Sequence, residues 1–308
     1  MKIYTLTLNP AYDVHATAEH LTLGCENLAS IHARQAGGKG VNVSRALKSH
    51  QVDNTALIVL GKENRGDFVR DLDAAGLKYQ LLEREGRIRE NLTVHCVSGP
   101  ETRISFRGFS VDDSLLRDVF ASMEIDAETV VTFTGSVPTG VSHECVLQFL
   151  HQLKEQGAKL VLDSKSLSLE DIYSLKPWLI KPNQEEISAY FDCWIDSADQ
   201  ALEKAAAFAE HGVANVMVSL GSQGAMLICG DQVFLAKPPA VEAISTIGAG
   251  DSSIAGFIAA ALDGKSPEDC LKTAVTFGTA ACMTEGTLPP RPQDTTAIFP
   301  QVQLVHIR

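Results

Sequence analysis

An aspartate that follows a glycine loop is the residue best placed to do chemistry in this chain. Asp251 comes directly after Gly248, Ala249 and Gly250. An apolar pattern with helical spacing follows it, at Ile254, Phe257, Ile258, Ala261 and Leu262. The start of a helix offers unpaired N–H groups and a positive dipole end, which suit phosphate, and a carboxylate beside that site suits proton abstraction from an attacking hydroxyl. We therefore predict a phosphate-binding loop with Asp251 as catalytic base; simple N-capping by Asp251 is the alternative.

A second glycine cluster precedes another helical pattern. Gly37, Gly38 and Gly40 surround Lys39, and the helix is expected over residues 41–47. Glycines let a ligand approach the backbone closely, and a lysine at a helix start favours an anion. The spacing differs from a Walker A loop, so the prediction is a second anion site of another type, with an ordinary flexible loop as the alternative.

Two further turns follow predicted strands. Asn183 and Glu186, after the strand 178–180, lie on the same side of a helix start, and their oxygens suit a hydrated Mg²⁺; an ordinary helix start is the alternative. Ser219, Gly221 and Gly224 follow the strand 216–219 and form a tight turn on which a nucleotide can lie, or a plain hairpin turn. The dinucleotide fingerprint G-x-G-x-x-G is absent from both glycine turns, which argues against a dehydrogenase.

Three polar residues nearer the N-terminus suggest a binding site for a sugar. Asp13 follows the Asn9-Pro10 turn at the end of the first predicted strand, where a carboxylate can bind sugar hydroxyls. Arg89 and Asn91 lie on a predicted hairpin and can bind a second anion. Taken singly, such residues are more often surface groups.

Composition excludes several classes of function. The chain has 308 residues and a formal charge of −12, from 26 basic and 38 acidic residues, so we expect no nucleic-acid or membrane partner. The seven cysteines are scattered without a C-x-x-C pair, which favours a reducing compartment over a zinc site. The N-terminus reads as a strand rather than a signal peptide, and a cytoplasmic protein is expected.

The elements that must position these residues alternate between strands and helices. Strands are expected at 3–8, 56–60, 130–134, 160–162, 178–180 and 216–219. Helices are expected around 41–47, 68–75, 146–153, 251–263 and 267–284. This alternation predicts an α/β fold with a mostly parallel sheet between helices, and ligands bound at the carboxyl ends of its strands. Segments 11–35 and 88–109, the latter with strands at 91–98 and 103–109, break the alternation and are expected to form a small β lid.

The motifs in this order resemble the ribokinase-like (pfkB-type) carbohydrate kinases, and within them the 1-phosphofructokinase and tagatose-6-phosphate kinase branch. The segments that carry the resemblance are 7–13, 36–43, 134–138, 181–186, 219–221 and 246–251. It implies one kinase domain over residues 1–308, a three-layer fold with a β lid over the site, and in many members a homodimer formed through the lids.

The resemblance also implies roles for individual residues. Asp251 is the expected base, and Gly248, Ala249 and Gly250 form the anion hole. The residues implied for the sugar phosphate are Asp13, Gly38, Lys39, Asn42 and Arg89. Those implied for ATP are Lys181, Asn183, Ser219, Gly221 and Gly224. Asn183 and Glu186 are expected to position Mg²⁺ through water.

The implied reaction is ATP-dependent phosphorylation of fructose 1-phosphate to fructose 1,6-bisphosphate. The alternatives are a tagatose-6-phosphate kinase, a kinase of another, unphosphorylated sugar, and a non-catalytic sugar-phosphate sensor. The chain departs from the family pattern at Leu28, where an arginine is usual, at Lys165 after the strand 160–162, and at Tyr12. Leu28 removes an expected phosphate contact, which Lys165 is a candidate to replace.

Overall fold

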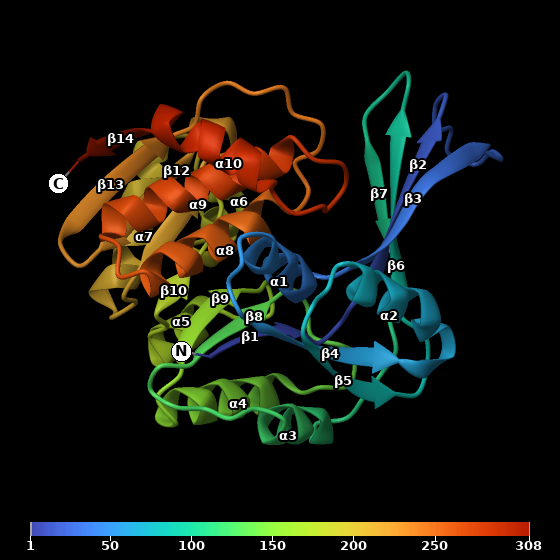
Figure 1. Cartoon of the computed structure of the whole chain (residues 1–308), viewed down its shortest axis with the longest axis horizontal. Helices are drawn as coiled ribbons and strands as arrows, with labels where there is room; N and C mark the ends of the chain where they lie inside the picture. Colours follow the sequence, from blue (N-terminus) through green and yellow to red (C-terminus); the bar gives the residue numbers. More distant parts are fainter. Residues whose placement is uncertain (1, 308) are drawn as a thin grey trace.

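A computed structural model describes residues 2–307 of the chain. It contains two sheets (Figure 1). The main sheet has ten strands in the order β14-β13-β12-β11-β10-β9-β8-β1-β4-β5, and every pairing from β5 to β11 is parallel. The strands of this sheet are β1 (Ile3–Thr7), β4 (Thr55–Gly61), β5 (Tyr79–Arg84), β8 (Val130–Thr134), β9 (Lys159–Asp163), β10 (Leu179–Ile180), β11 (Val216–Ser219), β12 (Ala225–Cys229), β13 (Gln232–Lys237) and β14 (Gln303–His306). The predicted α/β class with a mostly parallel sheet is confirmed.

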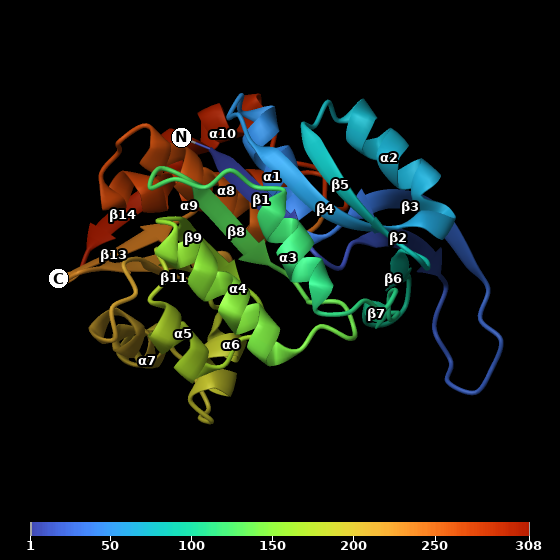
Figure 2. The same ribbon diagram turned by 90° about the horizontal axis from the view of Figure 1, so that it is seen from below.

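Helices cover both faces of the main sheet (Figure 2). On one face lie α1 (Lys39–Ser49), α2 (Arg65–Ala74), α8 (Ala249–Leu262), α9 (Pro267–Cys282) and α10 (Pro292–Ile298). On the other lie α3 (Ser114–Ala121), α4 (His143–Glu155), α5 (Leu169–Leu175), α6 (Gln184–Tyr190) and α7 (Ala198–Glu210). Successive strand residues point to opposite faces, so one strand serves both cores: Ile3 packs with the α8–α9 side and Tyr4 with the α4–α7 side.

The second sheet has four strands in the order β3-β2-β6-β7 and stands away from the main sheet in Figure 1. These strands are β2 (Ala11–Ala18), β3 (Ala29–Gly37), β6 (Arg89–Cys96) and β7 (Thr102–Ser105). The predicted segments 11–35 and 88–109 supply these strands, except that β3 continues to Gly37. The expected strand 91–98 begins and ends two residues earlier, as β6. The expected strand 103–109 is wrong in its extent, because the chain leaves β7 after Ser105.

The aspartate loop leads into α8 as predicted, but the helix is more enclosed than its apolar pattern suggested. Ala255 and Ala260 are buried as well as Ile254, Phe257 and Ile258, because α8 packs against both α1 and α9. Small residues allow this close packing, and it fixes the helix start relative to α1. Among residues 2–307, no helix combines the length and apolar character needed to span a membrane.

Candidate active site

The predicted site residues gather at one edge of the main sheet. Lys181 and Ser219 lie at or just beyond the carboxyl ends of β10 and β11, next to Asp163, which ends β9 and was not singled out from the sequence. Asp13 lies on the lid strand β2, which follows the carboxyl end of β1. The α1 and α8 helices begin at the same edge, and α1 packs against α8. Parallel strands end on the same side of a sheet, so residues far apart in sequence meet there.

Asp251 lies within the first turn of α8, where it does not cap the helix. The N-cap is Gly248, whose φ of 81° lies in the left-handed region that favours glycine, and no side chain caps this end. Asp251 is 6% exposed, and Asn42 Nδ2 donates a hydrogen bond of 2.8 Å to its Oδ2. The capping alternative is therefore not what the structure shows; the carboxylate faces α1.

The surroundings of Asp251 make its carboxylate a stronger base than an ordinary aspartate. Burial raises the pKa of Asp251 to about 6, opposed by the positive charge of Lys39 and assisted by the negative charge of Asp163. The hydrogen bond from Asn42 lowers the same pKa. With a pKa of about 6, this carboxylate is mostly ionised at neutral pH and still accepts a proton effectively.

Two lysines surround a buried carboxylate beside Asp251. Lys39 Nζ lies 2.9 Å and Lys181 Nζ 3.7 Å from Asp163 Oδ2. Burial works to raise the pKa of Asp163, but the two lysines outweigh it and the pKa is lowered. Burial likewise works to lower the pKa of Lys39, and Asp163 and Asp251 reverse that effect. The cluster thus holds two cations at the sheet edge, in position to bind an anionic substrate.

A glycine allows α1 to begin directly against β1. A Cβ on Gly40 would lie 2.2 Å from the carbonyl oxygen of Leu6 and 2.4 Å from Thr7 Oγ1. Any larger residue would push the helix away from the strand. Because Asn42 lies only two residues further on, this close approach helps to place its amide within hydrogen-bond distance of Asp251.

The lid residues predicted for the sugar form a connected hydrogen-bond chain. Asn91 Nδ2 donates to Asp13 Oδ1 at 2.9 Å, and Arg89 donates to Asn91 Oδ1 at 3.2 Å and to the Asn9 carbonyl at 3.3 Å. A residue that the sequence did not single out joins them: Arg103 on β7 lies 3.8 Å from Asp13 Oδ1. The lid therefore presents one carboxylate flanked by two guanidinium groups.

Several buried polar atoms in this region have no hydrogen-bond partner among residues 2–307. They include Asn9 Oδ1, Asn42 Oδ1 and Thr134 Oγ1. Burying such atoms without partners costs about 1–3 kcal/mol each. A ligand that carries several hydroxyl groups can satisfy them.

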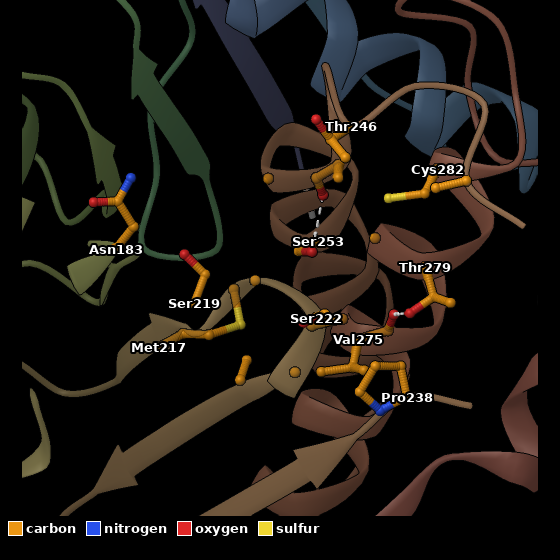
Figure 3. A pocket seen from close by; sticks show the side chains of 18 of the residues that line it. Asn183, Met217, Ser219, Ser222, Pro238, Thr246, Ser253, Val275, Thr279 and Cys282 are labelled. Carbon is orange, nitrogen blue, oxygen red and sulfur yellow. Dashed lines mark hydrogen bonds between the residues drawn. The ribbon is translucent and has the colours of Figure 1, made fainter. Parts of the chain in front are cut away.

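A cavity of about 900 Å³ opens on the other side of the α8 start (Figure 3). All five residues predicted for the nucleotide line it, together with Ala249 and Gly250: Lys181, Asn183, Ser219, Gly221 and Gly224. Figure 3 shows Asn183 and Ser219 on one side and Thr246, Ser253 and Thr279 on the other. The turn at Gly221–Gly224 joins β11 to β12, so the hairpin reading of that turn is confirmed. The nucleotide reading stays a prediction, for which the turn borders the cavity.

Asn183 and Glu186 form a reciprocal cap at the start of α6. Asn183 Oδ1 accepts from the Glu186 N–H at 2.8 Å, and Glu186 Oε2 accepts from the Asn183 N–H at 3.1 Å. Residues 2–307 contain no group of three or more His, Cys, Asp and Glu residues arranged to hold a metal. Magnesium usually keeps several waters and shares phosphate oxygens with one or two carboxylates, so the capped Glu186 still fits a water-mediated role.

The structure also places the three residues at which the chain departs from the family pattern. Leu28 is 85% exposed on the segment between β2 and β3. Lys165 is exposed just beyond β9. Tyr12 is fully buried on the opposite lid face from Asp13, where its hydroxyl bonds to the Asn64 carbonyl and the Phe68 N–H. Tyr12 thus packs the lid onto α2 and does not face the sugar residues.

Comparison with known proteins agrees with this architecture. The model of the pfkB family carbohydrate kinases matches residues 8–294. The chain is 33% identical over 282 residues to a 1-phosphofructokinase of Escherichia coli K12, covering 91% of this chain and 90% of that protein. It is 32% identical to the Bacillus subtilis 1-phosphofructokinase, covering 92% and 93%. The crystal structure of Escherichia coli phosphofructokinase-2 with substrates and products superimposes with a TM-score of 0.91 at 28% identity, covering 98% of this chain and 99% of that one. The chain belongs to the pfkB family of carbohydrate kinases.

Proposed function

We propose that this chain transfers the γ-phosphoryl group of ATP to a hydroxyl of fructose 1-phosphate, giving fructose 1,6-bisphosphate. The observation that carries the proposal is the position of Asp251. It is buried, has a pKa of about 6, and lies at a helix start between the nucleotide-sized cavity and the polar lid face. Sequence relatives named as 1-phosphofructokinases support the choice of acceptor.

In the proposed mechanism, Asp251 takes the proton from the attacking sugar hydroxyl. The N–H groups of Gly248, Ala249 and Gly250 at the α8 start face the transferred phosphoryl group and stabilise its negative charge. Lys181 borders Gly250, since a Cβ on Gly250 would lie 3.1 Å from Lys181 Nζ. Catalysis then rests on positioning and electrostatic stabilisation rather than on a covalent intermediate.

The acceptor sugar is assigned to the lid side of Asp251. Asp13 and Asn42 bind its hydroxyls, and the backbone at Gly38 allows the ring to approach closely. Lys39 and Arg89 bind the phosphate that the sugar already carries. The unpartnered buried oxygens of Asn9, Asn42 and Thr134 support a polyhydroxylated ligand here.

The nucleotide is assigned to the cavity lined by Lys181, Asn183, Ser219, Gly221 and Gly224. Its volume of about 900 Å³ suits a ligand of this size. Mg²⁺, when bound with ATP, would neutralise phosphate charge, and Asn183 and Glu186 would hold its water shell. The start of α6 keeps these two side chains in place through the reciprocal cap.

The lid is proposed to act with the rest of residues 1–308 as one kinase domain and to form a homodimer contact. Its apolar side chains Leu23, Leu28, Ile31, Val97 and Phe106 are between 53% and 99% exposed, which is unusual for a free surface. A tetrameric form is described for Escherichia coli phosphofructokinase-2. A Leu28→Asp, Ile31→Asp double variant should be monomeric in sedimentation; an unchanged mass would refute the lid contact.

The cell compartment is proposed to be the cytoplasm. All seven cysteines are free thiols, as is usual in a reducing compartment.

A different acceptor from fructose 1-phosphate is the main alternative, because Leu28 lacks the positive charge expected in the phosphosugar branch. Tagatose 6-phosphate, fructose 6-phosphate and an unphosphorylated sugar are the candidates. A non-catalytic sensor of sugar phosphate is the alternative from another class.

The deciding experiment measures ADP release with Mg-ATP and each of fructose 1-phosphate, tagatose 6-phosphate, fructose 6-phosphate, fructose and ribose. The proposal expects the highest kcat/KM with fructose 1-phosphate. A higher value with another acceptor would refute the choice of sugar. Thermal stabilisation by sugar phosphates without ADP release from any of them would refute catalysis and favour the sensor.

A further inference from the structure

The polar face of the lid contains an arginine that no part of the proposed mechanism uses. Asp13 pairs with Asn91 across β2 and β6, and two residues further along β6, Thr93 pairs with Arg103 on β7. Side chains two residues apart on a strand share a face. Arg103 therefore lies on the same lid face as Asp13, one row further along β6.

Arg103 differs from Arg89 in how firmly it is held. Arg89 is anchored by the Asn9 carbonyl and Asn91 Oδ1. Arg103 forms an ion pair with Asp13 Oδ1 at 3.8 Å, which is longer than a hydrogen bond. The Arg103 side chain is 48% exposed. A long, half-exposed arginine with a loose partner can move to a better anion at little cost.

Asp13, in contrast to Arg103, is buried and held by a hydrogen bond. Its side chain is 10% exposed, and its Oδ1 already accepts a hydrogen bond from Asn91. While Arg103 lies beside that same oxygen, the carboxylate is partly neutralised and its capacity to accept a sugar hydroxyl is reduced. The position of Arg103 thus affects how strongly Asp13 binds the acceptor.

We propose that Arg103 determines the preference for phosphorylated acceptors by exchanging partners. Arg103 moves away from Asp13 and binds the phosphate of the incoming sugar. This inference rests on the proposed phosphosugar kinase function. A phosphate dianion carries more charge than a carboxylate and accepts two parallel guanidinium hydrogen bonds, so it attracts Arg103 away from Asp13. The released Asp13 then accepts a sugar hydroxyl. A plain sugar offers nothing to attract Arg103, so Asp13 stays partly paired and binds that sugar weakly.

The partner exchange predicts that loss of Arg103 weakens the binding of the phosphosugar and strengthens the binding of plain fructose. In Arg103→Gln, the KM for the phosphosugar should rise roughly 10- to 100-fold, the range for losing a charge-assisted hydrogen bond. The inhibition constant of plain fructose against the phosphosugar should fall in the same variant, because Asp13 is no longer paired. Inorganic phosphate, used as a competitor, should inhibit the wild type and inhibit the variant more weakly, because only Lys39 and Arg89 then remain to bind it.

The experiment compares wild type, Arg103→Gln, Arg103→Lys and the control Arg70→Gln. Arg70 is an exposed arginine on α2 that also pairs with an aspartate, Asp67, away from the site. Arg103→Lys should have a phosphosugar KM closer to that of the wild type than Arg103→Gln has, which a purely structural loss would not allow. Arg70→Gln should leave the phosphosugar KM and the inhibition constants of fructose and phosphate unchanged. Arg103→Lys also serves as the test variant if Arg103→Gln does not fold.

The outcomes separate this inference from the proposed function. A wild type that turns over no phosphosugar refutes the function and the inference together. An active wild type whose KM for phosphosugar and inhibition by fructose are unchanged in Arg103→Gln refutes the partner exchange alone. An equal loss of affinity for the phosphosugar and for fructose would assign Arg103 a structural role, and it would also refute the partner exchange.

Discussion

Replacing Asp251 with asparagine should make the protein more stable at alkaline pH while removing its proposed base. The side chain is 6% exposed, and burial raises the pKa of Asp251 from 3.8 to about 6. In the folded protein the charged form is therefore penalised relative to the unfolded chain. An asparagine has nearly the same shape, carries no charge and can still accept a hydrogen bond from Asn42.

The size of the effect follows from the change in pKa. A rise from 3.8 to about 6 corresponds to roughly 3 kcal/mol of unfolding free energy, because one pKa unit is worth about 1.4 kcal/mol. A carboxyl group whose pKa is raised by folding stabilises the protein fully below its unfolded value. That contribution is lost as the pH rises through about 6. The advantage of Asp251→Asn should thus be complete at pH 8 and should vanish near pH 4.

Urea unfolding of wild type and Asp251→Asn at pH 8, 6 and 4.5 measures this difference. Asp231→Asn is the matched control, because Asp231 is exposed in the turn between β12 and β13. We expect a gain of about 2–3 kcal/mol at pH 8 for Asp251→Asn alone. Equal or lower stability of that variant at pH 8 would mean that Lys39 and Lys181 outweigh burial, and the reasoning on the base would be wrong.

Three other changes test separate parts of the site. Asn42→Ala removes the 2.8 Å hydrogen bond that lowers the pKa of Asp251, so the acid limb of the kcat/KM profile should move to higher pH; a limb that stays in place contradicts the pairing. Gly40→Ala places a Cβ 2.2 Å from a β1 carbonyl, so urea unfolding should show a loss of about 2 kcal/mol or more, and an unperturbed variant would refute the tight contact. Val275→Phe narrows the cavity, so the KM for ATP should rise at least tenfold while the sugar KM stays constant; the reverse pattern would move the nucleotide elsewhere.

The strands and turns of the main sheet could be predicted because local signals agreed with each other. The strands 130–134 and 216–219 have the bounds that their apolar runs indicated. The glycine loops before α1 and α8 were readable because a helix start and a close ligand approach both favour glycine there. Parallel topology then places residues after different strands at one edge, so the main members of the site follow from the order of motifs.

What could not be predicted depends on contacts between distant segments. Arg103 meets Asp13 only through the β2–β6–β7 register, which a single sequence does not specify. Asp163 follows the expected strand 160–162 directly, but its pairing with Lys39 and Lys181 depends on how three elements converge. Thr279 comes to the cavity from α9, a helix whose sequence carries no binding motif. The short edge strand β14 lacked a strong apolar alternation. Residues 103–107 do alternate, but β7 ends at Ser105, so the local pattern predicted too long a strand there.

The central claim is that Asp251 is the base that activates the sugar hydroxyl. Its most direct test compares kcat for ADP release by wild type and Asp251→Asn at saturating Mg-ATP and fructose 1-phosphate, with ATP affinity measured by calorimetry on both. The account predicts that kcat falls by at least about a hundredfold while ATP affinity changes by less than about threefold. An Asp251→Asn enzyme with near wild-type kcat would contradict it.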